Sequence, residues 1–194
     1  MKYFLGYDLG SSSVKVALLD SESGKPLASA FSPATEMKID SPVPGFAEQD
    51  PENWWSELQH ATKLLHEKIP FHKNEIGAIG ISYQMHGLVC IDKNQKALRP
   101  AIIWCDSRAV GYGSKAFEEL GERFCLEHFL NSPGNFTASK LKWVKENEPE
   151  IYKKIVRVLL PGDFIAMKMT GEAVTTIQGL SEGIFWDYKE NGIA

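Results

Sequence analysis

Residues 4–20 read FLGYDLGSSSVKVALLD, and this stretch decides what the first part of the chain can be. Apolar runs at residues 3–5 and 14–19 stand on either side of a segment of glycine and serine. Two apolar runs joined by a Gly/Ser turn are typical of a β-hairpin. The segment between the runs carries a single carboxylate, Asp8, at the end of the first predicted strand. The stretch therefore predicts an N-terminal hairpin with a polar turn.

The same turn has chemistry that suits a phosphate group. Glycine lets backbone N–H groups approach a ligand, and successive N–H groups in a turn form an anion-binding nest. Asp8 is suited to a hydrated Mg²⁺, because this hard cation prefers carboxylate and phosphate oxygens. The other candidates are donors or a cation, namely Gly10, Ser11, Ser12, Ser13 and Lys15. An ordinary hairpin, with Asp8 as a turn-forming residue, explains the same pattern.

Residues 8–15, DLGSSSVK, resemble the first phosphate motif of the actin, hexokinase and heat-shock-chaperone ATPases, in the form used by the FGGY carbohydrate kinases. The resemblance implies an α/β, ribonuclease-H-like domain, in which a mixed sheet with an antiparallel N-terminal meander is flanked by helices. It implies ATP and Mg²⁺ as cofactors. Asp8 would be the catalytic-site carboxylate that holds the metal, while Gly10 to Ser13 and Lys15 would lie at the phosphates. The segment at residues 8–15 is not a Walker A loop, because it does not end in Gly-Lys-Ser/Thr.

Composition sets limits on the class of protein. With 194 residues the chain is long enough for a substantial core, and a net charge of −4 gives no reason to expect nucleic acid or an anionic membrane as a partner. No apolar run reaches the roughly 18 residues of a membrane span, and the start lacks the pattern of a signal peptide. Three irregularly spaced cysteines suggest neither disulfides nor zinc. We expect a cytoplasmic protein with reduced thiols.

The next segments continue the meander and then start a helix. Residues 27–32 predict a third strand, and residues 33–50, with three prolines, predict a long surface loop. Asp50, Pro51 and Glu52 form a helix start, and apolar residues at helical spacing carry that helix to about Lys68. We expect Trp54 and Trp55 to pack in the core. The run AEQDPENWW also resembles a segment of the xylulose kinases of the FGGY family.

A polar turn follows the apolar strand predicted at residues 76–82, which we expect to be buried. Open α/β sheets bind ligands at the carboxyl ends of their strands. In this turn Gln84 and His86 can donate and accept hydrogen bonds, and Gly87 permits close approach; a histidine satisfied within a turn is the alternative. Residues 84–87, QMHG, resemble the xylulose-binding motif of xylulose kinases, which implies that Gln84, Met85, His86 and Gly87 bind the sugar. Gluconate kinases of the family carry a similar Met-His pair and are the nearest alternative.

Residues 104–108, WCDSR, precede a predicted helix, with Asp106 as a candidate N-cap and Arg108 paired at the surface. The resembling W-x-D-x-R segment of the family lines the sugar cleft, which makes Trp104, Asp106 and Arg108 further candidates. An amphipathic pattern broken at Gly121 comes next. A helix capped by Thr137, a short helix at residues 148–152, a buried strand at residues 155–160 and a helix at residues 161–170 then follow, in an order that resembles the family.

The family pattern is interrupted at residues 175–183, TTIQGLSEG, where two usual aspartates are replaced by Thr176 and Gly179 and Glu182 is new. A phosphoryl-transfer enzyme also needs a base and a nucleotide pocket. In the resembling kinases both lie in a second domain. We therefore expect residues 1–194 to be the N-terminal, sugar-binding domain of a D-xylulose kinase, either truncated or a natural fragment, without the ATP-binding domain and inactive alone.

A different class of function is also open. The chain is alternatively a non-catalytic sugar-binding or regulatory module, although the retained Asp8 argues against this. An isolated domain would expose the apolar face that normally meets its second domain, and such a face favours self-association, with a homodimer as the expected form.

Overall fold

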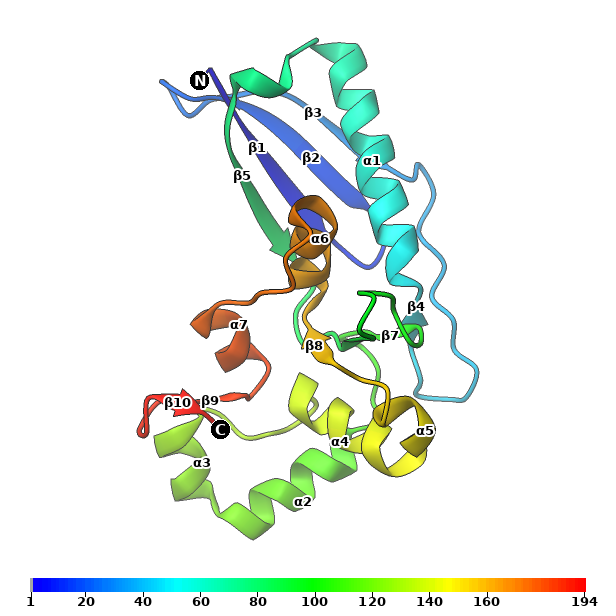
Figure 1. Cartoon of the computed structure of the whole chain (residues 1–194), viewed down its shortest axis with the longest axis vertical. Helices are drawn as coiled ribbons and strands as arrows, with labels where there is room; N and C mark the ends of the chain where they lie inside the picture. Colours follow the sequence, from blue (N-terminus) through cyan, green and yellow to red (C-terminus); the bar gives the residue numbers. More distant parts are fainter. Residues whose placement is uncertain (1) are drawn as a thin grey trace. The chain divides into compact units, whose positions relative to one another are not determined.

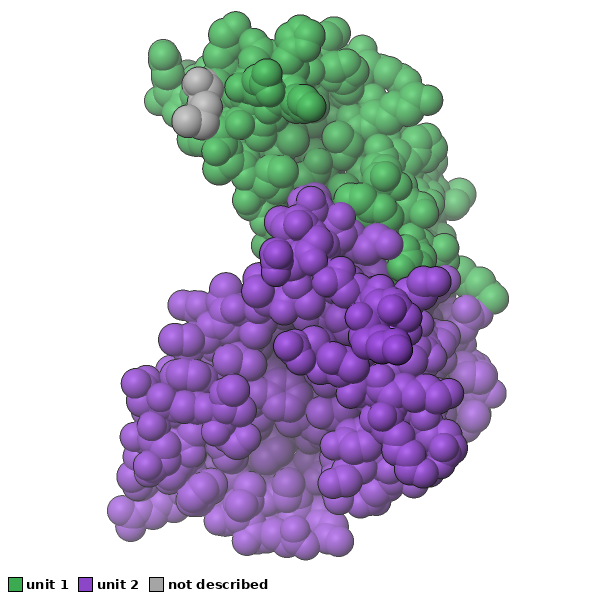
Figure 2. Space-filling view, viewed as in Figure 1, with its two compact units in different colours: residues 1–38, 51–84 green, residues 39–50, 85–194 purple. Residues whose placement is uncertain are grey.

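The computed structural model describes residues 2–194. The chain forms two compact units, one of Met1–Lys38 and Pro51–Gln84, the other of Ile39–Asp50 and Met85–Ala194 (Figure 2). We refer to them as unit 1 and unit 2, and each is described by itself.

Unit 1 contains a four-stranded mixed sheet in the order β3-β2-β1-β5 (Figure 1). Strand β1 pairs antiparallel with β2, β2 pairs antiparallel with β3, and β1 pairs parallel with β5. The strands are β1 (Tyr3–Leu9), β2 (Val14–Asp20), β3 (Pro26–Ser32) and β5 (Ile76–Tyr83). The predicted hairpin, the three-stranded meander and the mixed α/β sheet are thereby confirmed.

Helix α1 (Pro51–Lys68) packs against β2 and β3. It begins at the predicted proline, whose fixed backbone angle suits the first helical position and whose missing N–H costs nothing there. Its buried stripe is Trp54, Leu58, Ala61 and Leu65, all at helical spacing. Trp54 is fully buried, so the expectation of core packing is confirmed for this residue. It was wrong for Trp55, which lies beside the buried stripe and is only partly buried.

Strand β5 corrects one prediction. It follows a short 3₁₀ helix (Lys73–Glu75) and lies at the edge of the sheet rather than in a buried position. None of its residues is buried, and Ile79 is about half exposed. An apolar run at a sheet edge has the same composition as one in the interior, so sequence alone did not distinguish the two.

Unit 2 is built from short strands and six helices. Three two-stranded sheets pair β4 with β7, β6 with β8 and β9 with β10. The strands are β4 (Glu48–Gln49), β6 (Val89–Ile91), β7 (Ala101–Ile102), β8 (Arg157–Leu159), β9 (Trp186–Asp187) and β10 (Gly192–Ile193). The helices are α2 (Val110–Leu120), α3 (Glu122–His128), α4 (Thr137–Asn147), α5 (Pro149–Tyr152), α6 (Pro161–Thr170) and α7 (Ile177–Glu182).

Two glycines mark helix boundaries in unit 2. Gly121 separates α2 from α3 with a φ of 85°, and Gly171 ends α6 with a φ of 80°. Both angles suit glycine, which has no Cβ to clash. Two expectations were wrong: β8 is shorter than residues 155–160 and only its last residue, Leu159, is buried, and the segment at residues 33–50 is not all surface loop. Its last part forms β4, and Glu48 and Gln49 are buried.

Within residues 2–194, none of the helices has the length and apolar character needed to cross a membrane.

Candidate functional site

The predicted phosphate turn lies in unit 1, between β1 and β2. The Gly10 N–H donates to the Ser13 carbonyl at 3.0 Å and closes the turn, and the Met37 N–H donates to the Ser12 carbonyl at 2.8 Å. Asp8 stands opposite Lys15 in the hairpin register, with Lys15 Nζ 3.2 Å from Asp8 Oδ2. Both side chains are about half exposed or more. The turn is thus ordered by its own backbone while its charged groups face solvent.

An exposed carboxylate at the end of a strand fits a hydrated Mg²⁺, because this ion keeps several waters and takes only one or two protein carboxylates. Among residues 2–194 there is no group of three or more His, Cys, Asp or Glu side chains that would hold a metal by itself. A hydrated Mg²⁺ held by Asp8 would take its remaining ligands from water and phosphate oxygens. Lys15 adds positive charge beside Asp8.

Gln84 is the last residue of unit 1 and lies next to the phosphate turn. Its backbone N–H donates to the carbonyl oxygen of Leu9 at 2.7 Å. This hydrogen bond continues the parallel pairing of β1 with β5, in which Asp8 lies opposite Ser82. The side chain is buried. The parallel pairing of β1 with β5 therefore brings together the ends of two strands that are far apart in the sequence.

The Met85–Gly87 turn opens unit 2, and its backbone is held from several sides. His86 has a φ of 59°, which is the left-handed region. Its N–H donates to Glu182 Oε1 at 2.5 Å, and its carbonyl accepts from Lys140 Nζ at 2.7 Å. The Gly87 carbonyl accepts from Thr137 Oγ1 at 3.3 Å. Thr137 is the first residue of α4 and not its N-cap as predicted, and its hydroxyl serves this turn instead.

Side chains of the turn differ in what they present to solvent. A Cβ at Gly87 would overlap the ring of Pro161, so only glycine fits there without a shift. Met85 is 56% exposed, and the His86 side chain is 25% exposed. The imidazole packs edge-on against Phe136, with ring centroids 4.2 Å apart. The backbone of the turn is hydrogen-bonded to Glu182, Lys140 and Thr137, and the turn presents Met85 and part of His86 to solvent.

Two basic groups of this region are shifted by burial. Lys140 is fully buried, which lowers its pKa to about 8 although Asp106 and Glu182 act in the opposite direction. Burial, followed by the charge of Lys140, also lowers the pKa of His86 below its ordinary value. His86 is therefore neutral at pH 7, with one ring nitrogen that donates and one that accepts.

Asp106 and Arg108 belong to a buried cluster of charges in unit 2. Asp106 is fully buried, and its Oδ2 accepts from the Ala47 N–H at 2.6 Å. Arg108 Nη2 lies 2.7 Å from both Asp106 Oδ2 and Glu48 Oε1. Arg99 joins Glu48 and Glu148, at 2.5 and 2.8 Å. Buried charges of this kind persist only when each has a partner.

Two details differ from the sequence expectations. Asp106 does not cap α2, whose N-cap is Ala109; its Oδ1 instead accepts from the Arg108 N–H at 2.9 Å. The Arg108 side chain is buried rather than paired at the surface, with its guanidinium carbon 3.7 Å from the centroid of Phe46. Trp104, by contrast, is 49% exposed. Of these three candidates, Trp104 alone presents a large side chain to solvent.

Sequence reasoning missed Lys140, Glu48, Arg99 and Glu148, and it noted Glu182 only as a new residue of the stretch at residues 175–183, without a partner. A lysine and a glutamate on helix patterns look like solvated residues, and no spacing in the sequence marks them as partners of the His86 turn. Glu48 had one signal, since it lies in the AEQDPENWW run that the family comparison singled out.

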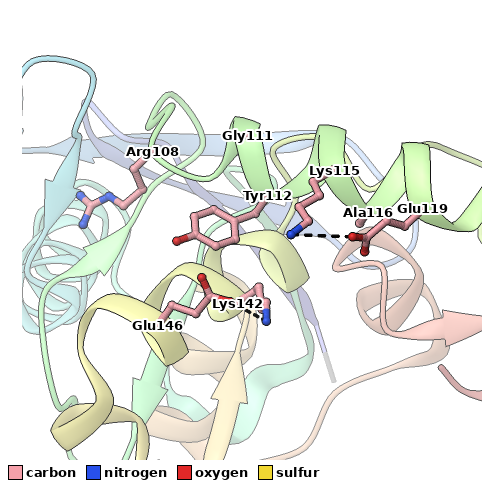
Figure 3. A pocket seen from close by; sticks show the side chains of 8 residues that line it. All are labelled: Arg108, Gly111, Tyr112, Lys115, Ala116, Glu119, Lys142 and Glu146. Carbon is pink, nitrogen blue, oxygen red and sulfur yellow. Dashed lines mark ion pairs between the residues drawn. The ribbon is translucent and has the colours of Figure 1, made fainter.

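A cavity of about 490 Å³ lies between α2 and α4. Figure 3 shows that exposed ion pairs edge it, Lys115 with Glu119 at 3.7 Å and Lys142 with Glu146 at 2.6 Å. Arg108 is the one predicted site residue in its lining. No residue of the Met85–Gly87 turn lines this cavity, so the cavity does not support the assignment of the sugar site to that turn.

Comparison with known proteins decides the family. Residues 3–191 match the model of the N-terminal domain of the FGGY family of carbohydrate kinases. The chain belongs to this family. It is 38% identical over 183 residues to a xylulose kinase of Escherichia coli (strain K12), covering 94% of this chain and 36% of that protein. The FGGY chain thus spans little more than a third of the length of this curated relative.

Solved structures agree with this placement. A "xyloylose kinase" from Brucella ovis superposes with a TM-score of 0.89 at 33% identity, over 99% of this chain and 39% of the other. A gluconate kinase from Lactobacillus acidophilus gives a TM-score of 0.87 at 24% identity, over 100% and 38%. The second likeness shows the fold alone. The predicted fold of the actin and hexokinase type is confirmed.

Proposed function

We propose that this chain is the sugar-binding N-terminal domain of an ATP- and Mg²⁺-dependent kinase, which transfers the γ-phosphate of ATP to the 5-hydroxyl of D-xylulose and forms D-xylulose 5-phosphate. The observation that carries the proposal is the Met85–Gly87 turn. Its backbone is fixed by Lys140, Glu182 and Thr137, and it exposes Met85 and part of His86. Xylulose kinases among the relatives favour this sugar.

Each group has a defined part in this proposal. Gln84, Met85, His86 and Gly87 bind the sugar, with Trp104 as an exposed aromatic surface for its apolar face. Asp106 and Arg108 act from the buried cluster, because their side chains have no solvent-facing surface to offer directly. Neutral His86 exchanges hydrogen bonds with hydroxyl groups without the desolvation cost of a charged ring.

The phosphate turn serves the nucleotide. Gly10, Ser11, Ser12 and Ser13 supply backbone and hydroxyl donors to phosphate oxygens, and Lys15 adds a positive charge. Asp8 holds Mg²⁺, which when bound would neutralise charge on the phosphates. Asp8 fits this role because its carboxylate is exposed and lies at the end of β1.

We assign the base that deprotonates the sugar hydroxyl and the adenosine pocket to a further, C-terminal domain, and expect the 194-residue chain to transfer no phosphate by itself. The exposed apolar residues of β5 and its neighbours are where we expect self-association into a homodimer. A cytoplasmic location fits the reduced thiols expected of the three cysteines.

The test is calorimetric titration of the chain with D-xylulose, D-gluconate and glycerol, followed by an assay of ATP turnover with D-xylulose. We expect selective heat with D-xylulose and no turnover. Selective binding of D-gluconate would replace the substrate by the gluconate alternative. Binding of sugar by a chain that ends naturally at Ala194 would favour the non-catalytic module, and no binding of any sugar would contradict the proposal for this chain.

A further inference from the structure

Glu182 is brought to the candidate sugar turn from the far end of the chain. It is the last residue of α7 and stands 96 residues from His86 in the sequence. One carboxylate oxygen, Oε1, lies 2.5 Å from the His86 backbone nitrogen and 3.6 Å from its Nδ1. The same atom therefore acts on both the backbone and the ring of this histidine.

The unusual stretch at residues 175–183 builds the helix that carries Glu182. Thr176 is the N-cap of α7, and its Oγ1 accepts from the Gly179 N–H at 3.1 Å. A Cβ at Gly179 would lie 2.5 Å from Thr175 Oγ1 and 3.3 Å from Leu160 Cδ1. Thr176 thus caps this short helix and Gly179 leaves room for the Thr175 side chain, in a helix that ends with Glu182 beside His86.

The backbone of His86 needs these contacts. A non-glycine residue with positive φ is disfavoured by the contact of its Cβ with the backbone. Glu182 takes the N–H of His86, and Lys140 gives a hydrogen bond to its carbonyl. The Glu182 carboxylate and the Lys140 ammonium group therefore bind the N–H and the carbonyl of the same residue. Each makes a charge-assisted hydrogen bond, which is stronger than a neutral one.

The ring of His86 is polarised by the same carboxylate. A separation of 3.6 Å is too long for a hydrogen bond, so Glu182 acts on Nδ1 through its charge. Nδ1 itself is buried, whereas the side chain as a whole is 25% exposed. The exposed surface must belong to other atoms of the side chain. A negative charge beside Nδ1 favours a proton on that nitrogen, which leaves Nε2 as a hydrogen-bond acceptor.

We propose that Glu182 is a positioning residue for His86, which fixes its left-handed backbone and its Nδ1–H tautomer so that Nε2 accepts a hydrogen bond from a hydroxyl group of the sugar. The identity of the ligand rests on the proposed function, but the state of the histidine does not. Discrimination follows, because a ligand must offer a hydroxyl donor at this place, and an analogue without it leaves Nε2 unpaired.

Nuclear magnetic resonance of the chain with ¹⁵N-labelled histidine measures the tautomer directly. At pH 7.5 we expect the His86 pattern of a protonated Nδ1 and an unprotonated Nε2. In Glu182→Gln, which keeps the shape and an acceptor oxygen, the preference for Nδ1–H should weaken. The pKa of His86 should fall further, because the negative charge that stabilises the imidazolium is gone. Glu172→Gln removes an exposed charge and is the matched control, with neither value changed.

Titration with D-xylulose then links the tautomer to binding. We expect Glu182→Gln to weaken the binding of D-xylulose by about ten-fold, as for the loss of one charge-assisted contact. The affinity of Glu182→Asp should lie between those of the unsubstituted chain and of Glu182→Gln. A protonated Nε2 in the unsubstituted chain overturns the inference and needs no variant to fold. An unchanged tautomer and pKa in a folded Glu182→Gln chain overturns it as well. The predicted tautomer without binding of any sugar supports the inference and contradicts the proposed function.

Discussion

Arg108 Nη2 lies 2.7 Å from Asp106 Oδ2, and the side chains of both residues are shielded from solvent. The pair connects two segments of unit 2, because Asp106 also accepts from the Ala47 N–H and Arg108 also contacts Glu48, the next residue along the chain. Removing one partner of a buried ion pair leaves an uncompensated buried charge. This lowers the free energy of unfolding more than replacing both partners by apolar residues does.

We therefore expect Asp106→Ala to lower the free energy of unfolding by about 3 kcal/mol, measured by urea denaturation. The matched control is Glu119→Ala, which breaks an exposed pair with Lys115 on α2 and should change stability by less than about 0.5 kcal/mol. Equal effects of the two substitutions would show that the buried cluster does not stabilise unit 2.

Two glycines on α2 give a second pair of variants. A Cβ at Gly113 would overlap the backbone of Gly134, whereas a Cβ at Gly111 meets nothing within 4 Å. Gly113→Ala should destabilise the chain by about 1–3 kcal/mol through overpacking. Gly111→Ala should stabilise it by up to about 1 kcal/mol, because alanine is the better helix former. Thermal unfolding followed by circular dichroism separates the two, and a stabilising Gly113→Ala would refute the close approach of α2 to this loop.

Lys140 predicts a pH dependence of stability. Its pKa is lowered from 10.5 to about 8 in the folded state, chiefly by burial. Between these values the folded chain binds fewer protons than the unfolded chain, so the contribution of Lys140 to the free energy of unfolding rises with pH. This contribution is complete above the unfolded pKa and is lost as pH falls through about 8.

The matched variant is Lys140→Met, which keeps a long side chain but does not titrate. Relative to it, the unsubstituted chain should gain about 2–3 kcal/mol between pH 7.5 and 10.5 in urea denaturation. Parallel curves for the two proteins would mean that Lys140 is not held in a desolvated site.

Asp8 should matter for metal binding and little for stability. Its pair with Lys15 is exposed, so Asp8→Asn should change the free energy of unfolding by less than about 0.5 kcal/mol. Mn²⁺, a paramagnetic substitute for Mg²⁺, should broaden the amide signals of residues 10–13 in the presence of ADP, and the substitution should abolish this broadening. Broadening that persists in Asp8→Asn would assign the metal to other ligands.

Local signals in the sequence predicted much of the fold. The Gly/Ser turn after Leu9 predicted the hairpin, and Asp50 with Pro51 predicted the start of α1. Gly171 marked the end of α6. In each case neighbouring residues determine the backbone, so no distant contact was needed to predict it.

Features that depend on distant contacts were missed or misplaced. Asp106 has the composition of a helix cap, but burial beside Ala47 and Arg108 gives it another role. The apolar residues of β5 suggested burial, yet the strand lies at a sheet edge. Glu182 reaches His86 across 96 residues, a pairing that no local pattern encodes. The turn at residues 84–87 was therefore recognisable in the sequence as a candidate sugar site, and its role stays a prediction, whereas the residues that hold this turn in place could not be predicted.

Calorimetric titration of His86→Ala with D-xylulose tests whether the His86 turn recognises the sugar. His66→Ala, at an exposed histidine on α1, is the control. We expect the unsubstituted chain and the control to bind D-xylulose alike, and His86→Ala to bind it at least about ten-fold more weakly because its hydrogen bond to the sugar is lost. Binding of D-xylulose by His86→Ala with unchanged affinity would contradict recognition of the sugar by this turn.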